Sequence, residues 1–258
     1  MDKALVTSED HGRVRSLRLD RPEAYNALSG ALIDALDNAL AAAVADDAIG
    51  ALVLSGAGRG FCAGHDLREI RSADARTLTA LFDACAALME RIVASPKPVI
   101  AAVHGVATAA GCQLVASCDL AVAARSARFA TPGVNLGLFC STPMVALSRA
   151  VPRKHALEML LLGELVDAER AERIGLVNRV VADGDELAEA LDLASRIASR
   201  SPLTLRLGKA AFQTQLDAPL ADAYRHCSRV MVENMLALDA IEGIDAFLEG
   251  RPPTWRDA

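Results

Sequence analysis

The order of hydrophobic and polar positions divides this chain into predicted strands and helices. Residues 14–19 alternate apolar and polar side chains, a pattern that predicts a half-buried strand. Residues 51–54 and 98–103 are short apolar runs, and we interpret both as buried strands. Apolar residues at helical spacing predict amphipathic helices over 30–44 and 76–94.

The rest of the pattern separates a mixed front from an all-helical end. Between residues 113 and 181 it predicts short strands over 119–124, 128–130 and 176–181, and helices over 113–117, 143–150, 153–162 and 167–174. From residue 185 onward it is helical throughout, in segments 185–200, 202–216, 219–237 and 239–248. We therefore expect an α/β core over residues 1–195 and a helical region over 196–258.

Composition and charge narrow the function classes. The chain has 258 residues and a formal net charge of −6, which argues against a general nucleic-acid binder because such proteins are usually basic. It contains no apolar run of ~18 residues, so no membrane span is expected. No secretory signal is apparent, and the six cysteines lack CxxC spacing. These features predict reduced, buried thiols and a cytoplasmic location.

The first candidate for chemistry is the glycine-rich stretch that follows the predicted strand at 51–54. Three glycines fall within residues 58–64, where the backbone must turn tightly or something must approach it. The residues after Gly64 favour a helix, so His65 lies near a helix start whose backbone N–H groups lack intrahelical partners. Such a site can stabilise an oxygen that becomes negative during a reaction.

A second stretch repeats this arrangement. The predicted strand at 98–103 leads into residues 105–112, almost all of which are small, so a ligand can approach the backbone closely. The amides near Ala110 and Gly111 open the next predicted helix. Two such units can supply two converging N–H donors.

Several of these segments together resemble a known family. The segments FCAGHDL at 61–67 and PVIAAVHGVATAAGCQL at 98–114 are similar to the two signature segments of the crotonase superfamily, the enoyl-CoA hydratase/isomerase family. Further segments resemble the family in the same order along the chain, at residues 21–28, 117–123, 129–132 and 171–177. The resemblance covers nearly the whole chain.

The resemblance implies a fold, an assembly and a ligand. The fold is a spiral of ββα units followed by helices that mediate trimerisation, so the expected assembly is a homotrimer or a dimer of trimers. The ligand is an acyl-CoA thioester whose oxygen binds the backbone amides of His65 and Ala110. Neither a separate cofactor nor a metal is expected, because coenzyme A is part of the substrate. The substrate-binding positions carried over are Ala24, Ala63, His65, Asp66, Leu67, Arg68 and Ala110.

Two positions depart from the family's hydratases, which the resemblance implies use two glutamates. The corresponding residues here are Gln113 and Gly133. A glutamine amide cannot take a proton from water at neutral pH, and glycine has no side chain. Some isomerases of the family place an acid where this chain has Ser141, although Ser141 or Thr142 before Pro143 is more typical of a helix start. We therefore expect an oxyanion hole without fast hydration.

Three functions stay open on these grounds. The first is an acyl-CoA enzyme of the family that stabilises a thioester enolate. The second is a malonyl-type acyl-CoA decarboxylase, since loss of carbon dioxide gives an enolate without a base. The third is a non-catalytic protein that binds CoA thioesters. A dinucleotide-binding fingerprint at Gly58, Gly60 and Ala63 is set aside, because the acid that it requires would fall near Asp83 inside a predicted helix.

Overall fold

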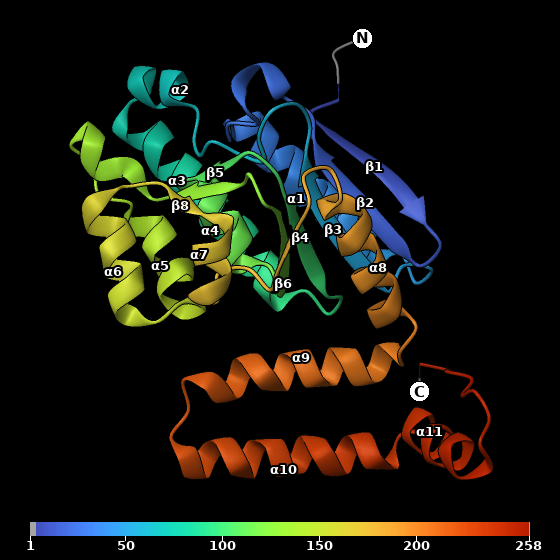
Figure 1. Cartoon of the computed structure of the whole chain (residues 1–258). Coiled ribbons are helices and arrows are strands. Elements are labelled where there is room, and N and C mark those ends of the chain that lie inside the picture. Colours follow the sequence, from blue (N-terminus) through green and yellow to red (C-terminus); the bar gives the residue numbers. More distant parts are fainter. Residues whose placement is uncertain (1–3, 258) are drawn as a thin grey trace.

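The computed structural model describes residues 4–257. Its larger sheet has six strands in the order β1, β2, β3, β4, β6, β9, and the smaller sheet has the order β5, β7, β8 (Figure 1). The strands are β1 Val6–His11, β2 Val14–Leu19, β3 Ala51–Gly56, β4 Val99–Val103, β5 Val106–Thr108, β6 Leu120–Ala124, β7 Arg128–Ala130, β8 Val166–Asp167 and β9 Arg179–Val181.

The larger sheet is parallel except at its edge, where β1 and β2 form an antiparallel hairpin. Parallel strands are covered by helices on both faces, so their sequences are apolar throughout. All residues of β4 are buried, as are the first five of β3. This explains why the apolar runs at 51–54 and 98–103 showed no alternation.

Helices cover the two faces of this sheet unequally. One face packs on a large core that includes Leu17, Leu52 and Leu54 together with side chains of α1, α3 and α4. The other face packs on α8 alone, through three buried alanines. The helices are α1 Gly30–Ala45, α2 Leu67–Ser72, α3 Ala75–Ala94, α4 Ala110–Ser117, α5 Ser141–Ala150, α6 Arg153–Leu162, α7 Ala168–Arg173, α8 Glu186–Ala198, α9 Pro202–Leu216, α10 Leu220–Leu236 and α11 Leu238–Glu249, with short 3-10 helices η1 Pro22–Ala24 and η2 Pro132–Leu136.

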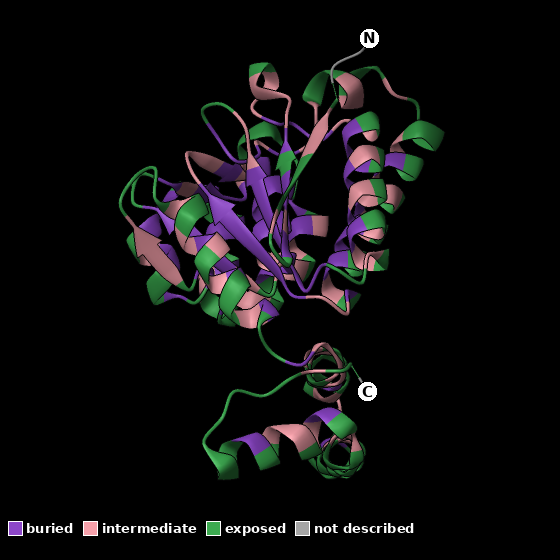
Figure 2. Ribbon diagram, turned by 90° about the vertical axis from the view of Figure 1, so that its right-hand side faces the viewer, coloured by how far each residue is buried: buried purple, intermediate pink, exposed green. Residues whose placement is uncertain are grey.

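The last three helices do not cover a face of the sheet, and α9 contacts the core through α3 and through the ion pair of Lys209 with Asp119. Figure 1 shows α9 and α10 side by side beneath the core, with α11 beside them. Figure 2 shows exposed and intermediate residues over most of their surface, whereas the strands of the larger sheet are buried. The predicted α/β front and helical end are confirmed. The boundary predicted at residue 195 lies within α8, and the division into domains stays a prediction.

Most predicted elements are present, with five notable differences. Helix α4 begins at Ala110 and not at residue 113, and β9 begins at Arg179 and not at 176. Strands β1, β5 and β8 were not predicted, and β1 was missed because three consecutive residues, 8–10, are exposed and polar. No helix within residues 4–257 is both long enough and apolar enough to cross a membrane.

Candidate active site

An apolar cavity of about 450 Å³ lies where the two glycine-rich segments meet α3 and the η2–α5 region. Its walls carry few polar side chains. Among residues 4–257, His65 and Cys140 are the titratable residues that line it, and no carboxylate or cationic side chain of this range does so. The lining residues are Ala63, His65, Leu67, Ile70, Phe82, Ala109, Ala110, Pro132, Gly133, Leu136, Leu138, Phe139, Cys140, Ser141, Thr142 and Pro143.

The first segment runs from the end of β3 to the start of α2. Gly64 has a φ of +97°, a conformation that glycine adopts without steric cost. The Asp66 carboxylate caps α2 by accepting hydrogen bonds from the amides of Arg68 (2.9 Å) and Glu69 (3.4 Å). It also pairs with Arg21 at 2.7 Å, and this hydrogen bond holds the pKa of Asp66 below its usual range. The Asp66 side chain therefore stabilises the turn through its hydrogen bonds and its ion pair.

The second segment leads through β5 into α4 and turns at an alanine. Ala109 has a φ of 49° and a ψ of −117°, a left-handed conformation that is unfavourable for any residue with a Cβ. No side chain caps α4, all of whose residues except Ala116 are buried. The amide of Ala109 donates to the Ala130 carbonyl of β7 at 2.9 Å, which fixes the strained residue to the smaller sheet.

The two segments are interlocked by backbone hydrogen bonds. The Cys62 amide donates to the Val106 carbonyl (3.1 Å), and the Thr108 amide donates to the Cys62 carbonyl (3.0 Å). The Thr108 hydroxyl donates to the Ala63 carbonyl at 3.0 Å. A Cβ placed on Gly111 would lie 2.0 Å from the Cys62 oxygen, so only glycine allows this approach. These contacts bring His65 and Ala110 to the same cavity.

The backbone amides of His65 and Ala110 are both without an acceptor among the described residues. The bridge between His65 and Leu28 uses the Gly64 carbonyl and the Asp66 amide, which leaves the His65 amide unpaired. Ala110 is the first residue of α4, where amides have no intrahelical acceptor. Gly64 and Ala110 are in close contact, because a Cβ on Gly64 would lie 3.3 Å from the Ala110 nitrogen.

The imidazole of His65 is largely buried in the wall of the cavity. Neither of its ring nitrogens has a hydrogen-bond partner among the described residues, and the ring packs edge-on against Phe82 with centroids 5.0 Å apart. Burial lowers the pKa of His65, so the ring is neutral at pH 7.

Gly133 and Cys140 form the opposite side of the cavity. The Gly133 amide donates to Cys140 Sγ at 3.3 Å. A Cβ on Gly133 would lie 2.9 Å from that sulfur and 3.0 Å from the Leu138 carbonyl oxygen, so the site has no room for a side chain without movement. Burial raises the pKa of the Cys140 thiol, which keeps it protonated at neutral pH.

The structure brings some of the predicted site residues together and not others. Ala63, His65, Leu67, Ala110, Gly133 and Ser141 line the cavity. Ala24, Asp66, Arg68 and Gln113 do not. Ala24 ends η1, next to Tyr25, whose carbonyl accepts a hydrogen bond from the Ala63 amide at 3.0 Å. Ser141 is the first residue of α5, and its hydroxyl donates to the Phe139 carbonyl at 3.4 Å.

Arg68 and Gln113 have contrasting environments. Arg68 is exposed on α2 and makes no ion pair with another described residue. Gln113 is only 4% exposed, and its Oε1 lacks a hydrogen-bond partner within residues 4–257. It is thus a buried polar group on α4, away from the lining of the cavity.

Sequence reasoning missed the apolar walls of the cavity. Phe82 belongs to the apolar stripe of α3, and that pattern alone does not separate a cavity wall from the core. Leu136, Leu138 and Phe139 are more than 40% exposed. Large apolar residues in an irregular segment were the available signal, because exposed apolar clusters frequently mark binding sites.

Comparison with known proteins assigns the family. A sequence profile of the enoyl-CoA hydratase/isomerase family matches residues 9–258. The chain belongs to the enoyl-CoA hydratase/isomerase family. The mitochondrial enoyl-CoA hydratase domain-containing protein 3 of Rattus norvegicus is 45% identical over 252 residues, which cover 97% of this chain and 84% of the relative. A probable enoyl-CoA hydratase of Rhizobium meliloti is 38% identical, with 94% of each chain covered.

Solved structures of family members superpose closely on this fold. A crystal structure of an enoyl-CoA hydratase from Mycobacterium smegmatis has a TM-score of 0.95 at 47% identity and covers 98% of this chain and 99% of its own. The human enoyl-CoA hydratase domain-containing protein 3 has a TM-score of 0.94 at 44% identity, with coverages of 97% and 100%. The expected family, crotonase-like fold and class of enzyme are confirmed. The cytoplasmic location stays a prediction, since the rat relative is named mitochondrial.

Proposed function

We propose that the cavity binds an acyl-CoA thioester whose carbonyl oxygen accepts hydrogen bonds from the amides of His65 and Ala110. The observation that carries this proposal is the pair of unpaired backbone N–H groups at the wall of one apolar cavity. Both amides lie at or next to the start of a helix, where the helix dipole also favours negative charge. The family resemblance assigns the same two amides to the thioester oxygen.

Such an arrangement stabilises an enolate. When charge moves onto the thioester oxygen, fixed donors in a dry site hold it without the reorganisation that water would need. Each donor of this kind contributes on the order of 10²–10³ in rate. The interlocked backbone of the two segments keeps the donors in place before the substrate binds.

Fast hydration of an enoyl-CoA does not fit this cavity. Adding water across a double bond requires a base for the water and an acid for the α-carbon. The resemblance assigns these roles to glutamates at the positions of Gln113 and Gly133. His65 and Cys140 are the titratable residues of the lining, and burial shifts both pKa values toward the neutral forms. We therefore propose weak or absent hydration of crotonyl-CoA.

The walls of the cavity favour an apolar acyl group. The large apolar residues that line it are Leu67, Ile70 and Phe82 of α2 and α3, and Leu136, Leu138 and Phe139 of η2 and the segment before α5. Burying the chain of an acyl group against these walls releases about 25 cal/mol per Å² of apolar surface.

Decarboxylation of a malonyl-type acyl-CoA is the second candidate. It is favoured by one observation: the described residues that line the cavity include no carboxylate and no cationic side chain. A substrate carboxylate in this cavity would lose its hydration without gaining a counter-ion, a state that favours release of carbon dioxide. The enolate left behind needs the two amides and no base.

The deciding experiment measures two reactions and one binding equilibrium with the unmodified protein. Purified protein is incubated with crotonyl-CoA, malonyl-CoA and a saturated acyl-CoA, and hydration, carbon dioxide release and binding are followed separately. Hydration with a kcat in the range of typical enzymes, ~1–10³ per second, would refute the argument from Gln113 and Gly133. Binding of these CoA thioesters without turnover of any of them would support the third function, a non-catalytic protein that binds CoA thioesters.

A pair of variants at residue 110 tests the oxyanion hole itself. Ala110→Pro removes one N–H at the first residue of α4, where helices tolerate proline, and should lower any turnover on the order of 10² or more. Ala110→Gly keeps the N–H and serves as the matched control. Equal turnover by the two folded variants would exclude the assignment.

Restoring the glutamates is a harder test than the sequence suggests. Gln113→Glu together with Gly133→Glu should raise hydration if both carboxylates reach the substrate. Any side chain at residue 133 would displace Cys140 or Leu138, so Cys140→Ala belongs in the same variant. A gain with all three substitutions and none with Gln113→Glu alone would support a missing acid as the cause of weak hydration.

The proposed assembly is a homotrimer or a dimer of trimers. Large apolar side chains are exposed along α9, α10 and α11, including Leu220, Leu236 and Phe247, each at least 75% exposed. An apolar surface of this size on a monomer favours association. Light scattering that shows a stable monomer at micromolar concentration would contradict the proposal.

A further inference from the structure

A second cavity, of about 570 Å³, lies at the opposite edge of the larger sheet from the candidate active site. The active site follows the carboxyl ends of β3 and β4, whereas this cavity is lined by Arg13, Gly50 and Lys97, which precede β2, β3 and β4. Its other walls are the end of α8, the start of α9 and the C-terminal segment around Trp255. The topology therefore separates the two cavities.

The lining of this second cavity is strongly cationic. It carries five basic side chains and two carboxylates, in a chain whose formal net charge is −6. The charged lining residues are Arg13, Lys97, Arg200, Arg206, Arg256, Asp47 and Asp257. A local excess of positive charge in an acidic protein attracts anions to that place.

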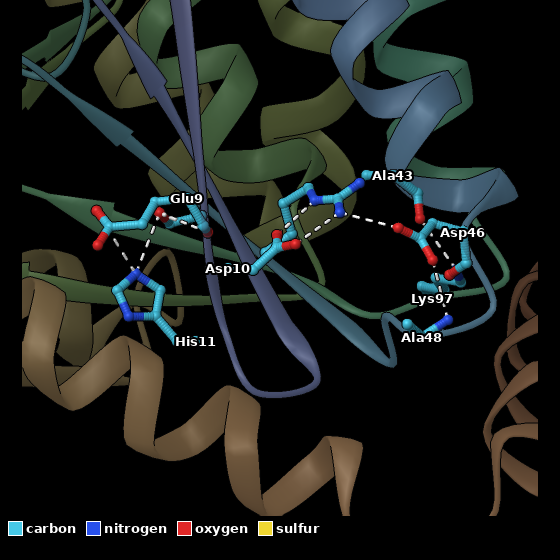
Figure 3. Close-up of polar contacts among 9 residues, drawn as sticks. Glu9, Asp10, His11, Ala43, Asp46, Ala48 and Lys97 are labelled. Atoms are coloured by element: carbon cyan, nitrogen blue, oxygen red, sulfur yellow. Dashed lines mark hydrogen bonds and ion pairs between the residues drawn. The ribbon is translucent and has the colours of Figure 1, made fainter.

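One wall is fixed by a polar network at the end of α1 (Figure 3). Lys97 Nζ donates to the Ala43 carbonyl at 2.9 Å and to the Asp46 carbonyl at 2.5 Å. Asp46 pairs with Arg15 at 2.9 Å, and Arg15 pairs with Asp10, so the β1–β2 hairpin is tied to the same network. Burial lowers the pKa of Lys97, the nearby Asp46 and Asp47 oppose this shift, and repulsion from Arg15 and Arg13 adds to it.

The opposite wall is the C-terminal segment, which a buried carboxylate holds in place. Asp239 is 1% exposed and accepts hydrogen bonds from the Arg256 amide (2.7 Å), the Asp257 amide (3.2 Å) and the Ser201 hydroxyl (2.6 Å). The Trp255 indole donates to the Ser199 carbonyl at 2.8 Å. These contacts fix the backbone from which Arg256 extends.

Three of the arginines form no salt bridge within the described part of the chain, although Arg256 adds to the effect of Arg251 in lowering the pKa of the Glu242 carboxyl. Arg206 pairs with Asp257 at 3.3 Å, but the guanidinium groups of Arg13, Arg200 and Arg256 form no ion pair with another residue of 4–257. Arginine presents a planar fork of donors that matches the oxygens of phosphate. Arginines that form no salt bridge with another described residue thus line one cavity from three separate segments.

We propose that this second cavity binds a small oligophosphate anion, with Arg13, Arg200 and Arg256 as its main ligands. Several phosphate groups fit the observation better than one, because the cations come from the β1–β2 turn, the α8–α9 connection and the C-terminal segment. Trp255 supplies an aromatic surface for a base if the ligand is a nucleotide. The proposal is independent of the acyl-CoA function.

The test is binding of tripolyphosphate and of ATP, measured by calorimetry at low ionic strength. The double variant Arg13→Ala, Arg200→Ala should weaken the Kd for both by at least about tenfold. The matched control is Arg153→Ala, Lys154→Ala, which removes the same charge from two exposed residues at the start of α6. Melting temperatures show whether each variant is folded.

The outcomes separate clearly. Loss of affinity in the double variant and not in the control supports the site. Equal affinities of the two variants would place the probes elsewhere, including the coenzyme A site, and would overturn the proposal. So would the absence of binding to the unmodified protein at millimolar concentrations of either probe.

A comparison of the two probes shows whether the cavity recognises phosphate groups alone or a nucleotide. Equal Kd values for tripolyphosphate and ATP indicate that phosphate groups alone are recognised. A lower Kd for ATP that Trp255→Leu returns to the value for tripolyphosphate indicates recognition of the nucleotide base. Both results support the site and differ only in the ligand that it takes.

Discussion

The two segments that carry the candidate oxyanion hole each turn sharply to place a backbone amide at the cavity, and they do so with different residues. The first reaches a left-handed turn with Gly64 and caps α2 with Asp66, which Arg21 holds in place. The second reaches its turn with Ala109 and leaves α4 without a side-chain cap. Both end in an unpaired amide at the same cavity. The first segment is stabilised locally by its own residues, whereas the second depends on the surrounding core to impose a strained backbone.

The largest expected loss of stability comes from a variant that disrupts the close approach of the two segments. Gly111→Ala would place a Cβ 2.0 Å from the Cys62 carbonyl oxygen, a backbone atom that cannot move without disturbing β3's following loop. We expect a loss of about 3 kcal/mol or more in the free energy of unfolding, measured in denaturant. Gly208→Ala is the control, because a Cβ there meets nothing within 4 Å and should be neutral or stabilising.

A smaller loss of stability is expected when the glycine at the turn of the first segment is replaced. Gly64→Ala combines a φ of +97° with contacts of 2.8 Å to Ala109 Cβ and 3.0 Å to the Thr108 oxygen. The expected cost is about 2–3 kcal/mol in the free energy of unfolding. Gly12→Ala has a positive φ and open space around it, so it isolates the conformational part. Equal costs for the two variants would show that the contact between the segments contributes nothing.

The cap of the first segment should contribute about 1 kcal/mol. Asp66→Ala removes two capping hydrogen bonds and the ion pair with Arg21, for an expected cost of about 0.5–2 kcal/mol near pH 7. Because the folded pKa of Asp66 is lowered, its stabilisation is complete above the ordinary value of about 3.9 and is lost as the pH falls through the folded pKa. The penalty measured by unfolding at pH 7 should therefore shrink progressively as the pH falls below about 3.9.

The smallest expected effect is a gain in stability and not a loss. Ala109→Gly relieves a left-handed alanine, which costs about 1–3 kcal/mol, but increases the entropy of the unfolded chain by about 0.4–1 kcal/mol. We expect a net gain of about 0.5–1 kcal/mol in the free energy of unfolding. A loss of stability would mean that the surrounding core does not strain this turn, and the contrast between the two segments would disappear.

The sequence predicted the first segment better than the second for a physical reason. Glycine at residue 64 and a capping aspartate at residue 66 are local signals of a turn and a helix start. An alanine at residue 109 carries no such signal, since its conformation is imposed by hydrogen bonds to distant residues such as Ala130. His65 and Ala110 came from the family resemblance, and the structure places both at one cavity.

The remaining parts of the site were not predictable from local pattern. Strand β1 was missed because both faces of this edge strand are exposed at residues 8–10, so its polar residues follow one another without alternation. Phe82 has the same spacing as its buried neighbours on α3, and only the fold shows that it faces His65. The position of Gln113 away from the lining likewise depends on how α4 is rotated within the core.

The interlocking of the two segments also has a consequence for folding. The hydrogen bond from Thr108 to Ala63 joins residues separated by 45 positions in the chain, and the bridge between Cys62 and Ala107 spans a similar distance. Contacts of this length form only after the intervening chain has lost entropy in closing a loop. Strands β3 and β4 pair across a similar separation, at Leu52 and Val99, so the same loop closure joins the two strands and assembles the donors. Native-state hydrogen exchange at the amides of Cys62 and Thr108 should report one shared opening event, in which the site and the centre of the sheet come apart together.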